Sequence, residues 1–110
     1  MENQLKLIRE RPNGEHYKIC SVIHMLPIPE LYKQSHVFST TIAFMGSKYY
    51  ADLYEKYNVD VCVCAHSHIR MEMEKNGVHY VNVSLGHNFK WKHKTSLYQE
   101  IIDTMYILDI

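Results

Sequence analysis

Residues Val61-Cys62-Val63-Cys64-Ala65-His66-Ser67-His68 (VCVCAHSH) decide the fold of this chain. The run from Val59 to Ala65 is apolar at both odd and even positions and has the length of a strand, which is typical of a strand covered on both faces. Two histidines follow where such a strand leaves its sheet. In open α/β sheets, ligands gather beyond the carboxyl ends of the strands. The stretch therefore predicts an α/β protein with a functional site at that edge of the sheet.

Four side chains in this stretch can bind metal, which raises the question of a zinc site. On an extended strand, the six residues from Cys62 to His68 span roughly 20 Å at about 3.3 Å per residue. A tetrahedral zinc site needs all four ligands within about 2.3 Å of the ion. A single Cys2His2 site therefore fails on geometry unless the chain folds back at Ala65. We interpret Cys62 and Cys64 as small buried residues of a central strand.

The remaining sequence predicts alternating helices and strands in one partial domain that covers residues 1–110. Apolar residues at helical spacing predict a helix over residues 1–10 and a second one after the N-cap Ser47. Asn76-Gly77 predicts a tight hairpin turn. The fold class expected is α/β, with a mixed sheet and two helices. Strands are expected over residues 17–24, 59–65, 69–74, 78–84 and 97–110.

Composition narrows the classes of function. The 110 residues carry twelve basic and twelve acidic side chains, so charge gives no indication of binding to nucleic acid or to an anionic membrane. No apolar run reaches the roughly 18 residues that a membrane span needs, and the N-terminus lacks the features of a signal peptide. Three cysteines do not make a disulfide framework. We expect a cytoplasmic protein.

Histidine is the unusual residue, with eight copies. His24 ends the first predicted strand just as His66 and His68 follow the central one, so we expect the three rings to lie within reach of each other. Neutral imidazole is the commonest metal ligand in proteins. The residues alone leave two interpretations open: metal ligands, or loop histidines with satisfied hydrogen bonds.

Several short motifs occur in a familiar order. They are His24-Met25-Leu26-Pro27 after a strand, Gly46-Ser47 before a helix, Ala65-His66-Ser67-His68, and residues 76–82 (NGVHYVN). This order, over about residues 5–90, resembles the C-terminal half of the calcineurin-like metallophosphoesterases. The resemblance implies half of an αββα sandwich. It also implies a metal-dependent phosphoesterase, which hydrolyses a phosphoric ester by metal-activated water.

The resemblance also implies site residues. His24, His66 and His68 are the expected metal ligands, and His36 and His87 are the expected contacts to a phosphoester substrate. The expected cofactors are divalent Mn, Fe or Zn ions, two in an intact enzyme and at most one in this chain. The family usually has glycine where this sequence has Ala65.

The motifs of the family's N-terminal half are missing from this sequence. They are an Asp-x-His, a Gly-Asp-x-x-Asp and a Gly-Asn-His. We therefore expect a truncated chain with little activity of its own, whose uncovered sheet binds a complementary N-terminal half or another chain. Whether the chain is an enzyme stays open. The alternatives are a non-catalytic α/β module that binds a partner and a mononuclear zinc-binding protein.

Overall fold

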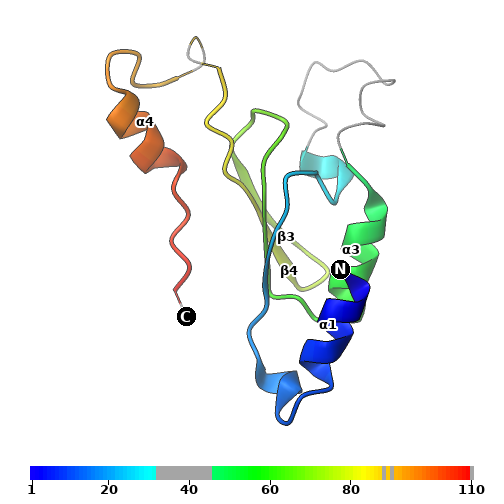
Figure 1. The fold of residues 1–110 in the computed structure, drawn as a ribbon. Coiled ribbons are helices and arrows are strands. Elements are labelled where there is room, and N and C mark those ends of the chain that lie inside the picture. The colour runs from blue at the N-terminus through cyan, green and yellow to red at the C-terminus, as the bar shows by residue number, and fades with distance from the viewer. Residues whose placement is uncertain (32–45, 88, 90, 110) are drawn as a thin grey trace.

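A computed structural model describes residues 1–31, 46–87, 89 and 91–109 (Figure 1). It confirms the α/β class, with a mixed four-stranded sheet and three α-helices among the described residues. The narrower expectation of a sandwich half is not shown. The elements are α1 (Glu2–Arg9), β1 (Cys20–Val22), α3 (Lys48–Lys56), β2 (Val61–Cys64), β3 (Met71–Lys75), β4 (Val78–Asn82) and α4 (Leu97–Thr104), with short 3-10 helices at Gly14–His16 and Pro29–Leu31.

The sheet has the strand order β1-β2-β4-β3. β1 and β4 both pair with β2 in parallel, and β3 pairs with β4 antiparallel through the predicted Asn76-Gly77 turn. Both turn residues have positive φ, 51° and 80°, as a tight hairpin turn requires. Because β1, β2 and β4 run in the same direction, their carboxyl ends meet at one edge of the sheet.

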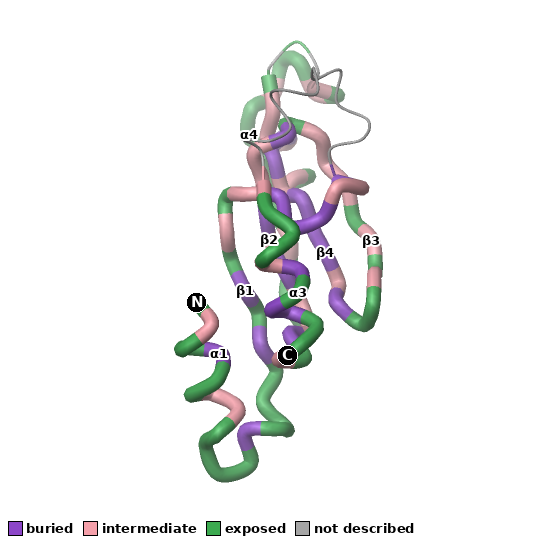
Figure 2. The backbone as a smooth tube through the Cα atoms, turned by 90° about the vertical axis from the view of Figure 1, so that its right-hand side faces the viewer, coloured by how far each residue is buried: buried purple, intermediate pink, exposed green. Residues whose placement is uncertain are grey.

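One face of the sheet packs on α1 and α3 and forms the core (Figure 2). Cys62 and Cys64 point into it and are 0% and 1% exposed, which confirms that they are buried strand residues. Tyr80 and Tyr54 complete this layer, each 0% exposed. A hydrogen bond with Cys64, together with burial, raises the pKa of the Cys62 thiol, so this thiol stays protonated at neutral pH.

The helix predicted after Ser47 is confirmed as α3. The Ser47 side chain accepts a hydrogen bond from the Tyr49 N–H at 3.3 Å, as an N-cap does. Leu53 and Tyr54 lie on the buried face, and the Tyr54 hydroxyl pairs with Ser21 Oγ of β1 at 2.8 Å. The helix is thereby fixed on the sheet by both apolar packing and a buried hydrogen bond.

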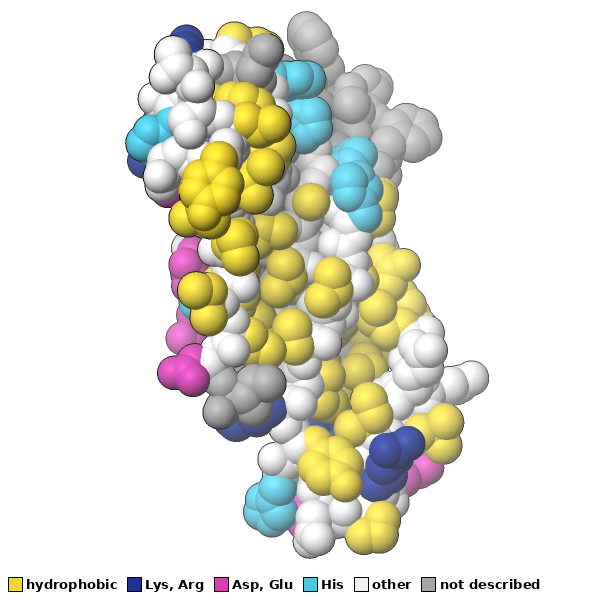
Figure 3. Space-filling model, turned by 60° about the vertical axis from the view of Figure 1, so that its left-hand side comes forward, with side chains coloured by type: hydrophobic (Ala, Val, Ile, Leu, Met, Phe, Trp, Pro, Cys, Tyr) yellow, Lys and Arg dark blue, Asp and Glu magenta, His cyan; other side chains and the backbone are white. Residues whose placement is uncertain are grey.

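The opposite face of the sheet is only partly covered. β2 was expected to be buried on both faces, and it is fully buried only on the face that carries Cys62 and Cys64. Val61 and Val63 are partly exposed, and Val22 of β1 is 74% exposed. The segment after α4 lies along this face, where residues such as Met105 and Leu108 line shallow cavities against the strands. Figure 3 shows hydrophobic side chains across this side of the molecule, with histidines toward its upper end and also at its lower end.

The strand predicted over residues 97–110 is wrong, because its first eight residues form the helix α4. Ser96 begins the helix by accepting a hydrogen bond from the Gln99 N–H at 3.2 Å, and Gln99 donates to Asp103 one turn later at 3.0 Å. These local bonds outweigh a loose alternation of apolar residues. No helix formed by the described residues is long and apolar enough to cross a bilayer.

α4 is anchored to the rest of the protein by Glu100, which is 0% exposed. Its carboxylate pairs with the Arg70 guanidinium and accepts a hydrogen bond from the His93 N–H at 2.5 Å. Arg70 also donates to the carbonyl oxygens of Ser84 and Leu85, each at 3.3 Å. Burial acts to raise the pKa of Glu100, but the His93 N–H and Arg70 outweigh it, so this pKa lies below its usual 4.5.

We predict that acid loosens α4. A carboxylate with a lowered pKa stabilises the folded state above its unfolded-state value, near 4.5, and this contribution is lost as the pH falls through the lower folded value. Glu100→Gln keeps the shape of the side chain but removes the titrating charge. In thermal unfolding between pH 7 and pH 3, the difference between the Tm of wild type and the Tm of the glutamine variant should shrink below pH 4.5. A difference in Tm that stays constant across this range would contradict the prediction.

Candidate functional site

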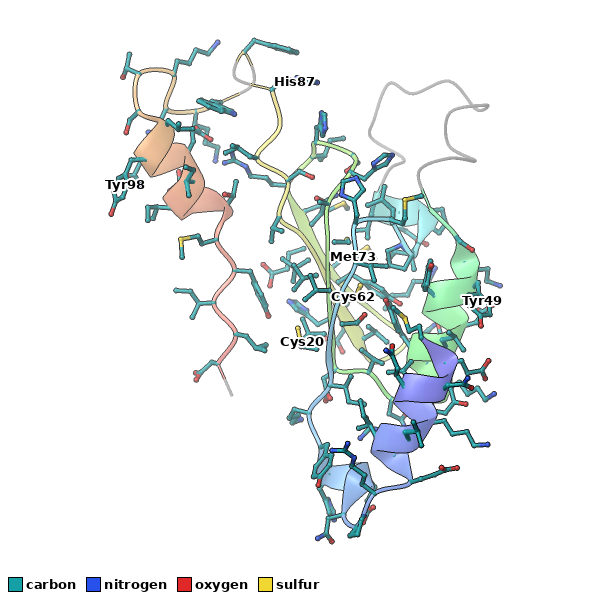
Figure 4. The ribbon with its side chains drawn as sticks, viewed as in Figure 1. Cys20, Tyr49, Cys62, Met73, His87 and Tyr98 are labelled. Atoms are coloured by element: carbon teal, nitrogen blue, oxygen red, sulfur yellow. The ribbon has the colours of Figure 1, made fainter. Side chains whose placement is uncertain are left out.

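Histidines gather at the carboxyl edge of the three parallel strands. His24 follows β1, His66 and His68 follow β2, and His87 lies beyond the end of β4. Figure 4 shows His87 at this end of the sheet, well away from Cys20 and Cys62 in the strands. The location is the one where α/β proteins bind ligands.

The rings of His24 and His66 are in direct contact. His24 Nε2 lies 2.8 Å from His66 Nδ1, and the ring centroids are 4.8 Å apart at an interplanar angle of 83°. One nitrogen donates to the other, so the pair shares one proton at this contact. Burial and the neighbouring His24 and His68 lower the pKa of His66. His66 is therefore neutral at physiological pH, and neutral imidazole is the form that binds metal.

His68 and His87 form a second pair of rings. The centroids of His68 and His87 are 4.6 Å apart at 78°, and both side chains are exposed. The structure thus places the predicted substrate contact His87 beside the predicted ligand His68, although the role of each stays a prediction. His36, the other predicted substrate contact, lies outside the described residues.

The backbone bends directly after β2, in the loop that carries His66 and His68. β2 ends at Cys64, and the Ser67 N–H donates to the Ala65 carbonyl at 2.8 Å, which bends the chain. His66 and His68 have φ angles of 67° and 58°, in the left-handed region, whereas Ala65 does not. Non-glycine residues in this region are uncommon and cluster at functional sites.

Asn82, at the end of β4, holds the bent loop in place. Its Nδ2 donates to Ser67 Oγ at 2.6 Å and to the Ala65 carbonyl at 3.2 Å. Its Oδ1 accepts from the Ser84 hydroxyl at 2.7 Å and from the Ser84 N–H at 3.2 Å. With Asn82 2% exposed, water does not compete for these bonds.

The histidine side chains have the right chemistry to bind a metal ion, but their arrangement suits an ion only in part. Imidazole nitrogens suit Zn and several other transition metals. Among the described residues, however, no group of three or more His, Cys, Asp or Glu side chains is placed to hold an ion. All four aspartates lie elsewhere; Asp60, for example, pairs with Lys18 and with the Ile19 N–H at the opposite end of β2. The metal roles of His24, His66 and His68 stay predictions.

Phe89 is a neighbour of the site that the sequence did not single out. Its ring lies 5.4 Å from that of His87 at an interplanar angle of 8°, a stacked arrangement. The direction of β4 could have revealed this neighbour. Because β4 runs parallel to β2, the segment that follows β4 is expected at the same edge of the sheet as His66 and His68.

Comparisons with known proteins give a structural match. No family model and no curated protein matches the chain. The crystal structure of phosphopantetheinyl hydrolase (PptH) from Mycobacterium tuberculosis is similar to this structure, with a TM-score of 0.64 over 86% of the chain and 20% sequence identity. The chain spans 32% of the length of that hydrolase. The fold is therefore shared with part of a hydrolase.

These comparisons contradict the assignment to the calcineurin-like metallophosphoesterases. The chain matches no family model, and the similar structure is that of a phosphopantetheinyl hydrolase. The motifs behind the assignment are short. Asn-Gly, for example, forms hairpin turns in many unrelated proteins.

Proposed function

We propose that His24, His66 and His68 bind a divalent metal ion in a protein that hydrolyses a phosphoric ester. The contact between His24 Nε2 and His66 Nδ1 is the observation that carries this proposal. Two nitrogens, from residues that follow different strands, face each other at the edge where α/β proteins bind ligands. The similar hydrolase supports the choice of reaction, because its name specifies a phosphopantetheinyl group, which contains a phosphoester.

The roles follow from the chemistry of the side chains. His24 and His66 hold the ion through neutral nitrogens, and His68, on the same bent loop, supplies a further nitrogen. A divalent ion in such a site supplies charge that neutralises a phosphate and lowers the pKa of water, which makes water a nucleophile. His87, beside His68, contacts a phosphate oxygen in this proposal.

Three histidines do not complete a hydrolytic centre. They carry no negative charge to offset a second divalent ion, and the carboxylates of the described residues lie elsewhere. We therefore propose that the remaining ligands come from a complementary segment or from another chain. The 110 residues alone should bind at most one ion and turn over an aryl phosphate slowly.

The test is a metal titration followed by thermal unfolding. At a Zn²⁺ or Mn²⁺ concentration a hundred times its Kd, a bound ion stabilises by about 2.7 kcal/mol, so the Tm of wild type should rise by roughly 10 °C. His66→Ala should remove this rise. His79→Ala is the matched control, because His79 pairs with Glu72 on the sheet, outside the proposed site. An equal rise in both variants would refute the proposal, and two tightly held ions with brisk turnover would refute the need for further ligands.

A non-catalytic module that binds a partner is the second candidate. The partly covered face of the sheet favours it, because Val22 and Ile107 are 74% and 82% exposed. Exposed apolar surfaces of this kind mark interaction sites. Unchanged thermal stability of wild type in added Zn²⁺ and Mn²⁺ would favour this candidate over the metal site.

A further inference from the structure

The helix α4 docks on the rest of the protein through a charge rather than through apolar packing. Glu100 is the one residue of this helix that is buried. The large apolar side chains of the helix are all exposed; they are Leu97, Tyr98, Ile101 and Ile102. Figure 1 shows α4 on the side of the sheet away from α1 and α3. A helix with so little buried apolar surface gives up little hydrophobic stabilisation when it detaches, so α4 is suited to exist in a docked and a detached state.

Arg70, the ion-pair partner of this helix, also holds two loops of the histidine cluster together. It lies two residues after His68 and directly before β3. Its guanidinium donates to the carbonyl oxygens of Ser84 and Leu85, which follow β4 and precede His87. Arg70 therefore ties the chain segment that carries His68 to the segment that carries His87. The ring centroids of these two histidines are 4.6 Å apart.

The same two segments touch at Gly86, next to one of the carbonyl groups that Arg70 binds. Gly86 has φ of 73°, and a Cβ at this position would lie 3.2 Å from the His68 carbonyl oxygen. The neighbouring Leu85 carbonyl accepts a second hydrogen bond, from the Trp91 indole N–H at 3.1 Å. In a contact this close, a shift of Gly86 is passed on to the backbone of His68. The position of the Arg70 guanidinium thus affects both loops.

We propose that the docking of α4 through Glu100 controls the geometry of the histidine cluster at the edge of the sheet. With the carboxylate in place, the guanidinium of Arg70 is held against both carbonyl oxygens, and the two loops stay together. Without it, the Arg70 side chain, which is already 29% exposed, turns toward water and releases them. None of the clustered histidines belongs to α4, so the coupling joins two separate places in the fold. Its effect on metal binding rests on the proposed function, whereas its effect on the loops does not.

This coupling acts in both directions, because linked binding equilibria are reciprocal. If docked α4 favours a bound ion, the ion favours docked α4 by the same factor. Changes to the groups that orient metal ligands typically lower metal affinity by 10–100-fold. We expect an effect of roughly tenfold, at the lower end of this range, because Glu100 acts through Arg70 and the backbone.

The first measurement is the Kd for Zn²⁺, obtained by isothermal titration of wild type, Glu100→Ala and Arg70→Lys. Both variants should raise the Kd roughly tenfold. Arg70→Lys keeps the positive charge but lacks the planar fork that reaches several acceptors at once. Lys75→Met is the matched control, because it breaks an ion pair with Glu30, 2.8 Å long, at the opposite end of β3. It should leave the Kd unchanged.

Hydrogen exchange measures the reverse direction of the coupling. Saturating Zn²⁺ should slow amide exchange in α4 roughly tenfold in wild type and in Lys75→Met, but not in Arg70→Lys. Exchange in α1, on the other face of the sheet, should not change, which separates the coupling from a general stabilisation of the fold. Equal slowing of α1 and α4 would overturn the coupling. An unchanged Kd in both Glu100→Ala and Arg70→Lys would also overturn it.

Nuclear magnetic resonance of the metal-free protein tests the loops without any ion. The amide signals of His68 and Gly86 should move in Glu100→Ala and stay in place in Lys75→Met. Signals that do not move in Glu100→Ala would overturn the coupling. If wild type binds no Zn²⁺ but these signals move, the coupling of α4 to the loops stands and the proposed metal site fails.

Discussion

Gly46→Ala should lower the free energy of unfolding by roughly 3 kcal/mol, the largest loss we expect from a single methyl group. Gly46 forms a parallel bridge with Leu26, and a Cβ at this position would lie 1.8 Å from the Leu26 carbonyl oxygen and 2.7 Å from its carbonyl carbon. Both atoms belong to the backbone, so no side chain can move aside. Leu26 is 1% exposed, which means that its displacement would disturb the core.

Gly77→Ala is the matched control for this prediction. Gly77 has φ of 80°, but no atom beyond its two neighbours in the chain lies within 4 Å of the position that its Cβ would take. This substitution should cost only about 1 kcal/mol, from the left-handed backbone alone. Urea unfolding followed by circular dichroism measures both variants. Equal losses would show that the close approach of Gly46 to Leu26 does not contribute to stability.

Asn82→Ala should destabilise the protein by about 3 kcal/mol and weaken the proposed metal site as well. The side chain makes four hydrogen bonds, to Ala65, Ser67 and both the hydroxyl and the N–H of Ser84. Its removal leaves buried polar groups without partners, and each such group costs about 1–3 kcal/mol. The loop that carries His66 and His68 also loses its attachment to β4. The Tm rise with Zn²⁺ should therefore shrink in this variant.

Two further variants test whether the weakened metal site of Asn82→Ala comes from the lost bonds to the loop that carries His66 and His68. Ser84→Ala removes one hydrogen bond to Asn82 and leaves the bonds to the loop, so it should cost about 1 kcal/mol and keep the Tm rise with Zn²⁺. Asn3→Ala, on the exposed side of α1, should change stability by less than about 0.5 kcal/mol. If Asn82→Ala kept the full rise with Zn²⁺, Asn82 would have no part in positioning the histidines.

Local sequence signals located most of the elements. As predicted, Ser47 caps α3, the apolar run forms β2, and Asn76-Gly77 forms the hairpin turn between β3 and β4. These signals worked because their causes lie within a few residues: a side-chain cap, a strand-length apolar run, and a turn that accepts positive φ. The same kind of local cause was overlooked at Ser96, and α4 was taken for a strand.

The site was predictable only in part. The positions of His24 and His66 after two apolar strands indicated that they would meet, and their rings lie in contact. The bend at His66 and His68 was not predictable, because it depends on Asn82, which is distant in sequence. The parallel pairing of β4 with β2, which brings His87 and Phe89 to the same edge, also depends on contacts between distant residues.

The sequence by itself determined where most of the strands and helices begin, which cysteines are buried and which residues follow the strands. These properties arise from hydrophobic periodicity and from hydrogen bonds between near neighbours. Tertiary structure alone decided the order of the strands, the left-handed loop and the ring contacts of His24 with His66 and of His68 with His87. Those features depend on the free energy of packing between segments far apart in the chain, which no local pattern of residues contains.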